Sequence, residues 1–444
     1  MKTEAKKTIR LAFPIIVGEL AQMALHLIDS AMVGAISYKQ LAASALVFNT
    51  LHIPFVFGIG ITISVSQMVS MAHGQRDGQR VSHFFFNGFF LCALIAVIIS
   101  GALFFGSDIL FHLGQDPEVA TLAVPFMKMM AISIVPMLFF MTLKQFTDGL
   151  EFTKIAMILS LVGLPVNVFL NWLLIYGNLG FPRLELMGAG LGTLITRSLL
   201  FITLGIIIFR HGYFKRYIAV RKKQWKIKLN TIKELLHIGI PSSFQLGMEA
   251  GAFAVSGILV GTIGAIEQAA HSIAISCVAF MFMFSMGLEQ AGSIRVSNAF
   301  GRSKWDKIAV IGKSTLLIAL AYGVLCALIL ILFNKSLPLL FNSNVEVVKV
   351  AGTLLFLAAI FQISDSTQAT AAGLLRGIKD VKIPTYLIAI AFWVIGLPVG
   401  YVLAFNFKMG PAGIWIGFIV GLTSMSVFLT SRFFRMVNRN IVKK

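Results

Sequence analysis

Long apolar runs alternate with short polar connections along the whole chain. Each run is long enough to cross a bilayer as a helix, which takes about 20 residues. Six runs precede a basic stretch in the middle of the chain and six follow it. The runs cover residues 11–36, 45–72, 84–106, 121–148, 155–177, 188–210, 235–262, 270–299, 308–333, 348–375, 384–406 and 411–434. The pattern predicts an all-α polytopic membrane protein with twelve transmembrane helices.

The chain repeats itself at an offset of 227 residues. Pro14 falls on Pro241, and Gly60 falls on Gly287, without a gap over about 60 residues. Each half contains an even number of runs, so both halves have the same orientation in the membrane. A parallel repeat of this kind places the site of a transporter between or inside the halves. We therefore predict two six-helix lobes, residues 1–210 and 235–444, joined by a basic linker, residues 211–234.

Composition and charge placement agree with this topology. Only 12% of the residues are charged, against about 25% in soluble proteins, and the mean hydropathy is +0.88. Most of the 37 lysines and arginines lie at one set of alternate run ends, among which we count Lys144. The positive-inside rule then predicts cytoplasmic termini in a plasma (inner) membrane. The net charge of +19 is explained by topology and by anionic lipid, so no nucleic-acid partner is expected.

The first run carries a polar stripe formed by Glu19, Gln22, His26 and Asp29. Their spacing of three, four and three places them on one face of a helix. A carboxyl group in mid-membrane costs about 2.5–3.5 kcal/mol and usually faces protein or a water-filled cavity. Glu19 and His26 can simply bond neighbouring helices. For Asp29, in the second half of the run, we expect a functional role.

Three further acids lie inside runs of the second half: Glu249, Glu289 and Asp365. Small glycines flank Glu249, while Gln362 and Gln368 recur at three-residue spacing on the same face as Asp365. Two acids of one half, each among small or polar residues, indicate a path for a cation. No motif assigns a role to Glu289.

Neutral amides accompany the acid of the first half. Asn167 and Asn171 lie one helical turn apart in the fifth run, and Thr193 in the sixth run can join them. Oxygen ligands beside one carboxylate suit a small hard cation. The same groups equally suit interhelical hydrogen bonds, and the sequence leaves both interpretations open.

Several functional classes lack support in the sequence. There is no GxxxxGK[ST] phosphate-binding loop, no HExxH, no CxxC and no nucleophile elbow. We therefore expect neither an enzyme nor a bound cofactor. A membrane-embedded enzyme would need clustered His, Asp or Ser residues, and the histidines are scattered. A two-fold repeat without a pore-ring signature also argues against a channel.

Four motifs together resemble the multidrug and toxic compound extrusion (MATE) family, NorM-like branch, over nearly the whole chain. The motifs are Pro14, Asp29 and Val33-Gly34 in the first run, their echo at Pro241 and Gly261, IRVSNAFG from Ile294 to Gly301, and RGIKDVKIP from Arg376 to Pro384. The resemblance implies twelve helices in two lobes, and drug export driven by inward movement of sodium or protons.

The resemblance also implies roles for individual residues. Asp29 becomes the coupling residue of the first lobe, with Asn167, Asn171 and Thr193 beside it. Glu249 and Asp365 become the cation-binding acids of the second lobe. Sodium is possible at either place. Other polar residues are expected to line a substrate cavity: Gln22, His26, Gln362, Gln368 and Glu289.

The leading hypothesis is thus a monomeric, cation-coupled antiporter that exports amphipathic, often cationic compounds by alternating access. A lipid-linked sugar flippase of the same broader superfamily is the alternative within transporters. Such flippases usually have a cavity rich in basic residues, whereas the charges inside the runs of this chain are mainly acidic.

Overall fold

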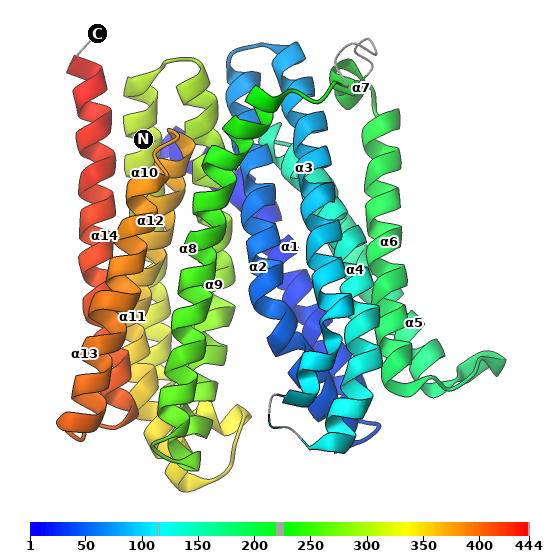
Figure 1. The fold of residues 1–444 in the computed structure, drawn as a ribbon. Helices are drawn as coiled ribbons and strands as arrows, with labels where there is room; N and C mark the ends of the chain where they lie inside the picture. The colour runs from blue at the N-terminus through cyan, green and yellow to red at the C-terminus, as the bar shows by residue number, and fades with distance from the viewer. Residues whose placement is uncertain (113, 115, 219–225, 443–444) are drawn as a thin grey trace. The chain divides into compact units, whose positions relative to one another are not determined.

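The computed structural model describes residues 1–112, 114, 116–218 and 226–442. In this part of the chain, twelve helical segments are long and apolar enough to span a membrane, as predicted (Figure 1). They are α1 (Lys2–Gly34), α2 (Tyr38–Gly74), α3 (Gly78–Phe105), α4 (Pro117–Gly149), α5 (Thr153–Tyr176), α6 (Glu185–Arg210), α8 (Leu229–Gly261), α9 (Ala265–Gly301), α10 (Trp305–Leu332), α11 (Val345–Gly377), the segment Lys382–Asn406 and α14 (Pro411–Val442). The described residues form no β-strand.

Short helices connect or interrupt these spans. The helix α7 (Gly212–Ile218) follows α6 and is too short to cross a membrane. The segment Lys382–Asn406 is not a uniform α-helix. It consists of α12 (Lys382–Ala389), the π-helical η5 (Ile390–Gly396), α13 (Leu397–Tyr401) and the π-helical η6 (Val402–Asn406). Short 3₁₀ helices lie in the connections: η1 (Ser107–His112), η2 (Asn178–Gly180) and η4 (Pro338–Leu340).

The chain forms two compact units whose boundaries repeat at the offset found in the sequence. The N-terminal unit is Val17–Ser243, and the C-terminal unit combines Met1–Ile16 with Phe244–Lys444. The two boundaries, after Ile16 and after Ser243, are 227 residues apart. Each leading helix, α1 or α8, therefore contributes its first half to one unit and its second half to the other. The predicted linker includes residues 219–225, which lie outside the described residues, so the predicted domain boundaries stay predictions.

Repeated glycines lie where these first halves pack. A Cβ atom on Gly60 of α2 would lie 2.4 Å from the Cα of Ser243, within the N-terminal unit. A Cβ atom on Gly287 of α9 would lie 3.2 Å from the backbone nitrogen of Ile16, within the C-terminal unit. Gly60 and Gly287 are the pair matched by the repeat. Glycine at both positions allows two backbones to approach closely.

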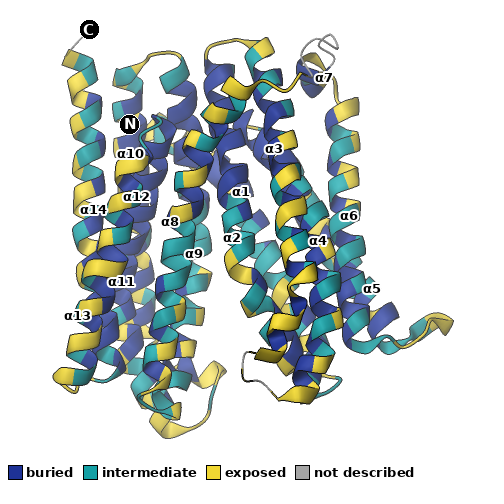
Figure 2. Cartoon of the chain, in the orientation of Figure 1, coloured by how far each residue is buried: buried dark blue, intermediate teal, exposed yellow. Residues whose placement is uncertain are grey.

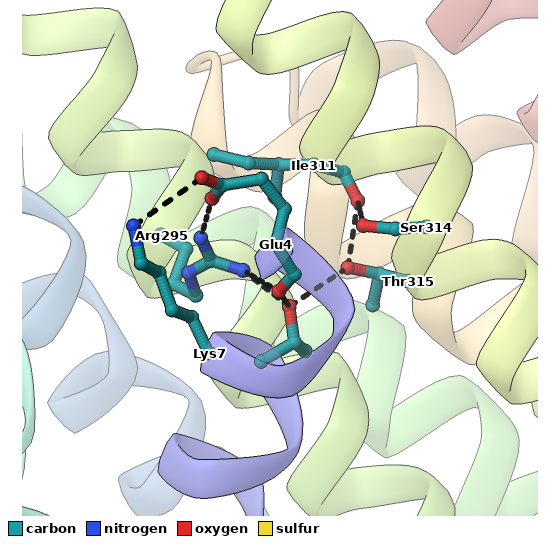
Figure 3. A network of polar contacts seen from close by, with 7 residues as sticks. Glu4, Lys7, Arg295, Ile311, Ser314 and Thr315 are labelled. Atoms are coloured by element: carbon teal, nitrogen blue, oxygen red, sulfur yellow. Dashed lines mark hydrogen bonds and ion pairs between the residues drawn. The ribbon is translucent and has the colours of Figure 1, made fainter. Parts of the chain in front are cut away.

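The beginning of α1 is tied to the C-terminal unit by a buried arginine (Figure 3). Arg295 of α9 forms an ion pair with Glu4 and donates to the Glu4 carbonyl oxygen at 2.6 Å. The same guanidinium donates to the hydroxyl of Thr8, which lies 3.5 Å from the hydroxyl of Thr315 on α10. The intramembrane charge of Arg295 is thus neutralised inside the unit.

The helices α4 and α11 are the centres of their units. The helix α4 packs against α2, α3, α5 and α6, and α11 packs against α9, α10 and α14. Both are rich in polar residues, yet half of the membrane window of each is buried (Figure 2). Their polar side chains therefore lie inside the protein, where other helices supply hydrogen-bond partners.

Candidate functional site

Asp29 lies on the second half of α1 and is 4% exposed. Its Oδ1 accepts a hydrogen bond from Asn171 Nδ2 at 2.5 Å, and its Oδ2 accepts one from Thr193 Oγ1 at 3.2 Å. Asn171 Nδ2 also donates to Asn167 Oδ1 at 3.2 Å. The structure thus brings together all four residues that the sequence placed in the first-lobe set. Whether they handle a cation stays a prediction at this point.

Close packing of α5 and α6 explains how these groups meet. A Cβ atom on Gly188 would lie 2.5 Å from the carbonyl oxygen of Leu174, and one on Gly192 would lie 2.4 Å from Asn171 Oδ1. The glycines of α6 therefore let α5 approach until its amides reach Asp29. Asn171 Oδ1 is buried and has no hydrogen-bond partner among the described residues. A carboxylate beside an unused amide oxygen is a suitable set of ligands for a small hard cation.

A cavity of about 320 Å³ opens beside this carboxylate, within the N-terminal unit. Asp29, Gln22 and His26 line it, and Glu19 lies at its wall as well. That Gln22 and His26 contact a substrate stays a prediction. The remaining wall is mainly apolar. It is formed by Leu25, Phe48, Leu51, Phe55, Ile59, Met130, Ile134, Met137 and Met141, together with Asn49, His52 and Arg197. The His26 ring packs edge-on against Phe48, with ring centroids 4.4 Å apart.

The C-terminal unit holds the second set of acids. Asp365 of α11 is 2% exposed and accepts a hydrogen bond from Gln368 Nε2 at 3.3 Å. Glu249 of α8 is close enough to interact electrostatically with Asp365, and no hydrogen bond from a described residue reaches its carboxylate. Gln362 is fully buried, and its Oε1 has no hydrogen-bond partner within the described chain. Neither of the two acids forms an ion pair with a described residue.

Glu289 has a different environment from the other two acids. Its Oε1 accepts a hydrogen bond from Arg376 Nη1 at 2.8 Å, and Arg376 also donates to Gln245 Oε1 at 3.1 Å. The arginine joins α8, α9 and α11 inside the C-terminal unit. Because its charge neutralises Glu289, Glu249 and Asp365 are the acids among these three that have no ion-pair partner within the described chain.

The family of the chain follows from a sequence match that occurs twice. The sequence model of the MatE family matches residues 14–173 and again residues 241–402. The chain belongs to the MatE family. The two matches begin 227 residues apart, at Pro14 and Pro241, so the internal repeat is confirmed together with the family.

Relatives of this MatE chain carry transporter names. It is 35% identical to the probable multidrug resistance protein NorM of Rhizobium meliloti, over 98% of this chain and 94% of that protein. It is 30% identical to the multidrug resistance protein NorM of Photobacterium profundum, over 97% and 95%. Its fold matches the crystal structure of the eukaryotic MATE transporter AtDTX14 with a TM-score of 0.89, at 22% identity over 99% and 98% of the two chains. The chain is therefore a multi-pass membrane transporter and not an enzyme, as expected.

Two cations within the helices of this MatE protein, the half-buried Arg197 and the buried Lys144, had no role in the sequence prediction. Arg197 lies one turn after Thr193, lines the cavity and donates to Ser133 Oγ at 2.7 Å. Lys144 was counted among the charged run ends. It is instead 3% exposed, and its Nζ lies 2.9 Å from Glu19 and 3.6 Å from Asp148. In the sequence, these two residues are visible only as cations within apolar runs. That position does not indicate which residue each cation contacts.

Proposed function

We propose that the chain is a cation-coupled antiporter that exports amphipathic, often cationic, drugs and toxic compounds. Multidrug efflux is the function that the family and the named relatives support. The coupling ion, sodium or a proton, is the further step of the proposal, and it enters as a transported substrate rather than as a resident cofactor. The exported compound is a small molecule.

The observation that carries the proposal is the position of Asp29. Its carboxylate is buried, is held by Asn171 and Thr193, and lines the cavity of the N-terminal unit. A proton or sodium ion at Asp29 would remove a negative charge from the cavity wall. A cationic compound would then bind less tightly, and ion entry would favour its release.

Glu249 and Asp365 are proposed as the coupling acids of the C-terminal unit. A buried and a half-buried carboxylate that interact with each other favour a bound cation, because a cation offsets their mutual repulsion. Arg376 already compensates Glu289. We therefore propose that Glu289 lines the substrate path, together with Gln362 and Gln368, and does not bind the coupling ion.

The lining of the cavity favours an organic cation over a lipid-linked sugar. Methionine and phenylalanine side chains form an adaptable apolar wall. Two carboxylates, Glu19 and Asp29, and one guanidinium, Arg197, are the charged groups among the described lining residues. Because Lys144 neutralises Glu19, the wall is left with one carboxylate and one guanidinium, and an anionic sugar–pyrophosphate head would meet no net positive charge there.

The division of α1 and α8 between the units supports alternating access. A helix whose halves belong to two units can bend where they meet, and Pro14 and Pro241 lie two residues before the respective boundaries. We propose that the transporter works as a monomer in the plasma membrane, with cytoplasmic termini and membrane lipid around it.

A transport assay tests this function. The full-length protein is reconstituted in vesicles, and efflux of a fluorescent organic cation is followed under an imposed sodium gradient or pH gradient. One of the two gradients should drive efflux. If neither drives it, the antiporter proposal is wrong.

Three substitutions test the site assignment separately. Asp29→Asn, Glu249→Gln and Asp365→Asn should each abolish or strongly reduce gradient-driven efflux. The matched control is Glu346→Gln, which changes an exposed carboxylate on the same helix as Asp365 and should leave efflux unchanged. Normal efflux by all three variants would show that the acids were assigned wrongly even if the protein is an antiporter.

A further inference from the structure

A second and larger cavity lies in the N-terminal unit, away from the groups assigned above. It measures about 610 Å³ and forms a groove between α3 and α6. Both helices pack on α4, whose Leu143 contributes to the lining. The lining residues are Phe85, Phe86, Asn87, Phe89, Phe90, Ala93, Leu143, Phe201, Ile202, Gly205, Ile206, Phe209, Lys226 and Ile227. None of them belongs to the proposed transport site.

The walls of the groove are aromatic and open towards the surroundings of the unit. Phe89 of α3 and Phe201 of α6 lie with ring centroids 6.4 Å apart, and each is close to Phe139 of α4, at 5.1 and 5.2 Å. Further out, Phe90 is 44% exposed and Ile206 is 50% exposed. The lining of α6 extends over eight residue steps, or about 12 Å. A groove of this composition within membrane-spanning helices fits a stretch of acyl chain.

One end of the groove is charged, and the charge is positive. Lys226 is the single charged residue among the described lining residues. Asn87 holds it there: Asn87 Oδ1 accepts from the backbone nitrogen of Lys228 at 2.7 Å, and Asn87 Nδ2 donates to the Lys226 carbonyl oxygen at 3.5 Å. Both lysines are exposed.

The acids near this end are already engaged. Asp77 accepts from the backbone nitrogen of Arg80 as the N-cap of α3, and Glu234 lies 3.4 Å from the Arg80 guanidinium. The described groove wall itself contains no acid, so nothing in it opposes a negative group at Lys226. An apolar groove between transmembrane helices that ends in lysines is the arrangement that recognises an acidic lipid head group.

We propose that the groove between α3 and α6 binds an anionic glycerophospholipid. One acyl chain lies along the aromatic wall, and the phosphate lies at Lys226 and Lys228. These lysines lie directly before α8, the second leading helix. A lipid bound there stabilises the position of residues 226–228 against α3.

The test uses the full-length protein in detergent and two lipids with identical acyl chains, phosphatidylglycerol and phosphatidylcholine. Mass spectrometry of the intact protein counts the lipid molecules that remain bound. Wild-type protein should retain the first phosphatidylglycerol at least about fivefold more than phosphatidylcholine, the factor expected for one surface lysine. Equal retention of the two lipids would overturn the choice of an anionic head group.

Two variants locate the lipid. A Cβ atom on Gly205 would make only an ordinary contact, 3.7 Å from Leu143 Cδ1, so Gly205→Leu fills the groove without displacing the backbone. It should abolish retention of the first phosphatidylglycerol. Lys226→Gln, at an exposed position, should lower phosphatidylglycerol retention about fivefold and leave phosphatidylcholine unchanged.

The matched control is Gly101→Leu, on α3, where nothing lies within 4 Å of the added Cβ atom. It should retain phosphatidylglycerol as the wild type does. If Gly205→Leu retains as much as Gly101→Leu, the lipid binds elsewhere and the groove is not its site. If Lys226→Gln leaves the preference for phosphatidylglycerol unchanged, the assignment of the phosphate is wrong.

Discussion

Asp29 is a carboxylate positioned by two neutral donors rather than by a cation. Thr193 supplies one of them from α6, and a hydrogen bond to a charged group contributes about 1.5–3 kcal/mol. Thr193→Val should therefore reduce gradient-driven efflux roughly tenfold, less than Asp29→Asn does. Ser198→Ala on the same helix is the control, because the Ser198 hydroxyl bonds only the Leu194 carbonyl oxygen among the described residues. Equal efflux by both variants would show that Thr193 does not contribute to the site.

Lys144 neutralises two acids inside the N-terminal unit, the buried Asp148 and Glu19 at the cavity wall. Its Nζ lies within 3.6 Å of Asp148 and 2.9 Å of Glu19, and both the lysine and Asp148 are buried. Lys144→Met should lower the free energy of unfolding by about 3–5 kcal/mol, because two carboxylates lose their partner. The thermal melting of the detergent-solubilised protein measures this. Lys154→Met, at an exposed position, should melt like the wild type. Unchanged melting of Lys144→Met would contradict the structural role.

At the scale of the helix, the repeated glycines mark positions where a side chain has no room. Leucine at position 287 would force the backbone of Ile16 to move. Gly287→Leu should destabilise the protein by about 1–3 kcal/mol, the usual cost of overpacking. Gly257→Leu is the control, because nothing lies within 4 Å of its added Cβ atom. If the two variants have the same melting temperature, α1 and α9 are not in close contact at this point.

The spans were predictable because hydropathy is a local property. Every apolar run forms a helical segment, the eleventh in four pieces, and the fourth and tenth runs, which are rich in polar residues, form α4 and α11. The partners of buried charges were not predictable, since they depend on distant helices. Lys144 meets Glu19 across 125 residues, and Arg376 meets Glu289 across 87. The Asp29 set was an exception, because the polar residues within the runs and the family resemblance together indicated which residues to compare.

At the scale of the whole molecule, neither half of the sequence contains a complete unit. The C-terminal unit needs Met1–Ile16, and the N-terminal unit needs the beginning of α8. A C-terminal fragment that begins just before α8 should therefore remain sensitive to protease when expressed alone. Co-expression with the N-terminal fragment should restore protection. Full protection of the lone C-terminal fragment would show that Met1–Ile16 adds little to its stability.

The packing of the first helix turns also has a consequence for genetics. Leu11, Ala12 and Ile15 share one apolar cluster with Leu288, Ala291 and Ile294. A selection for second-site suppressors of a damaging change at Leu11 should return compensating changes near codon 290 more often than near codon 30. Suppressors of changes at the beginning of the gene would then lie mostly in its second half.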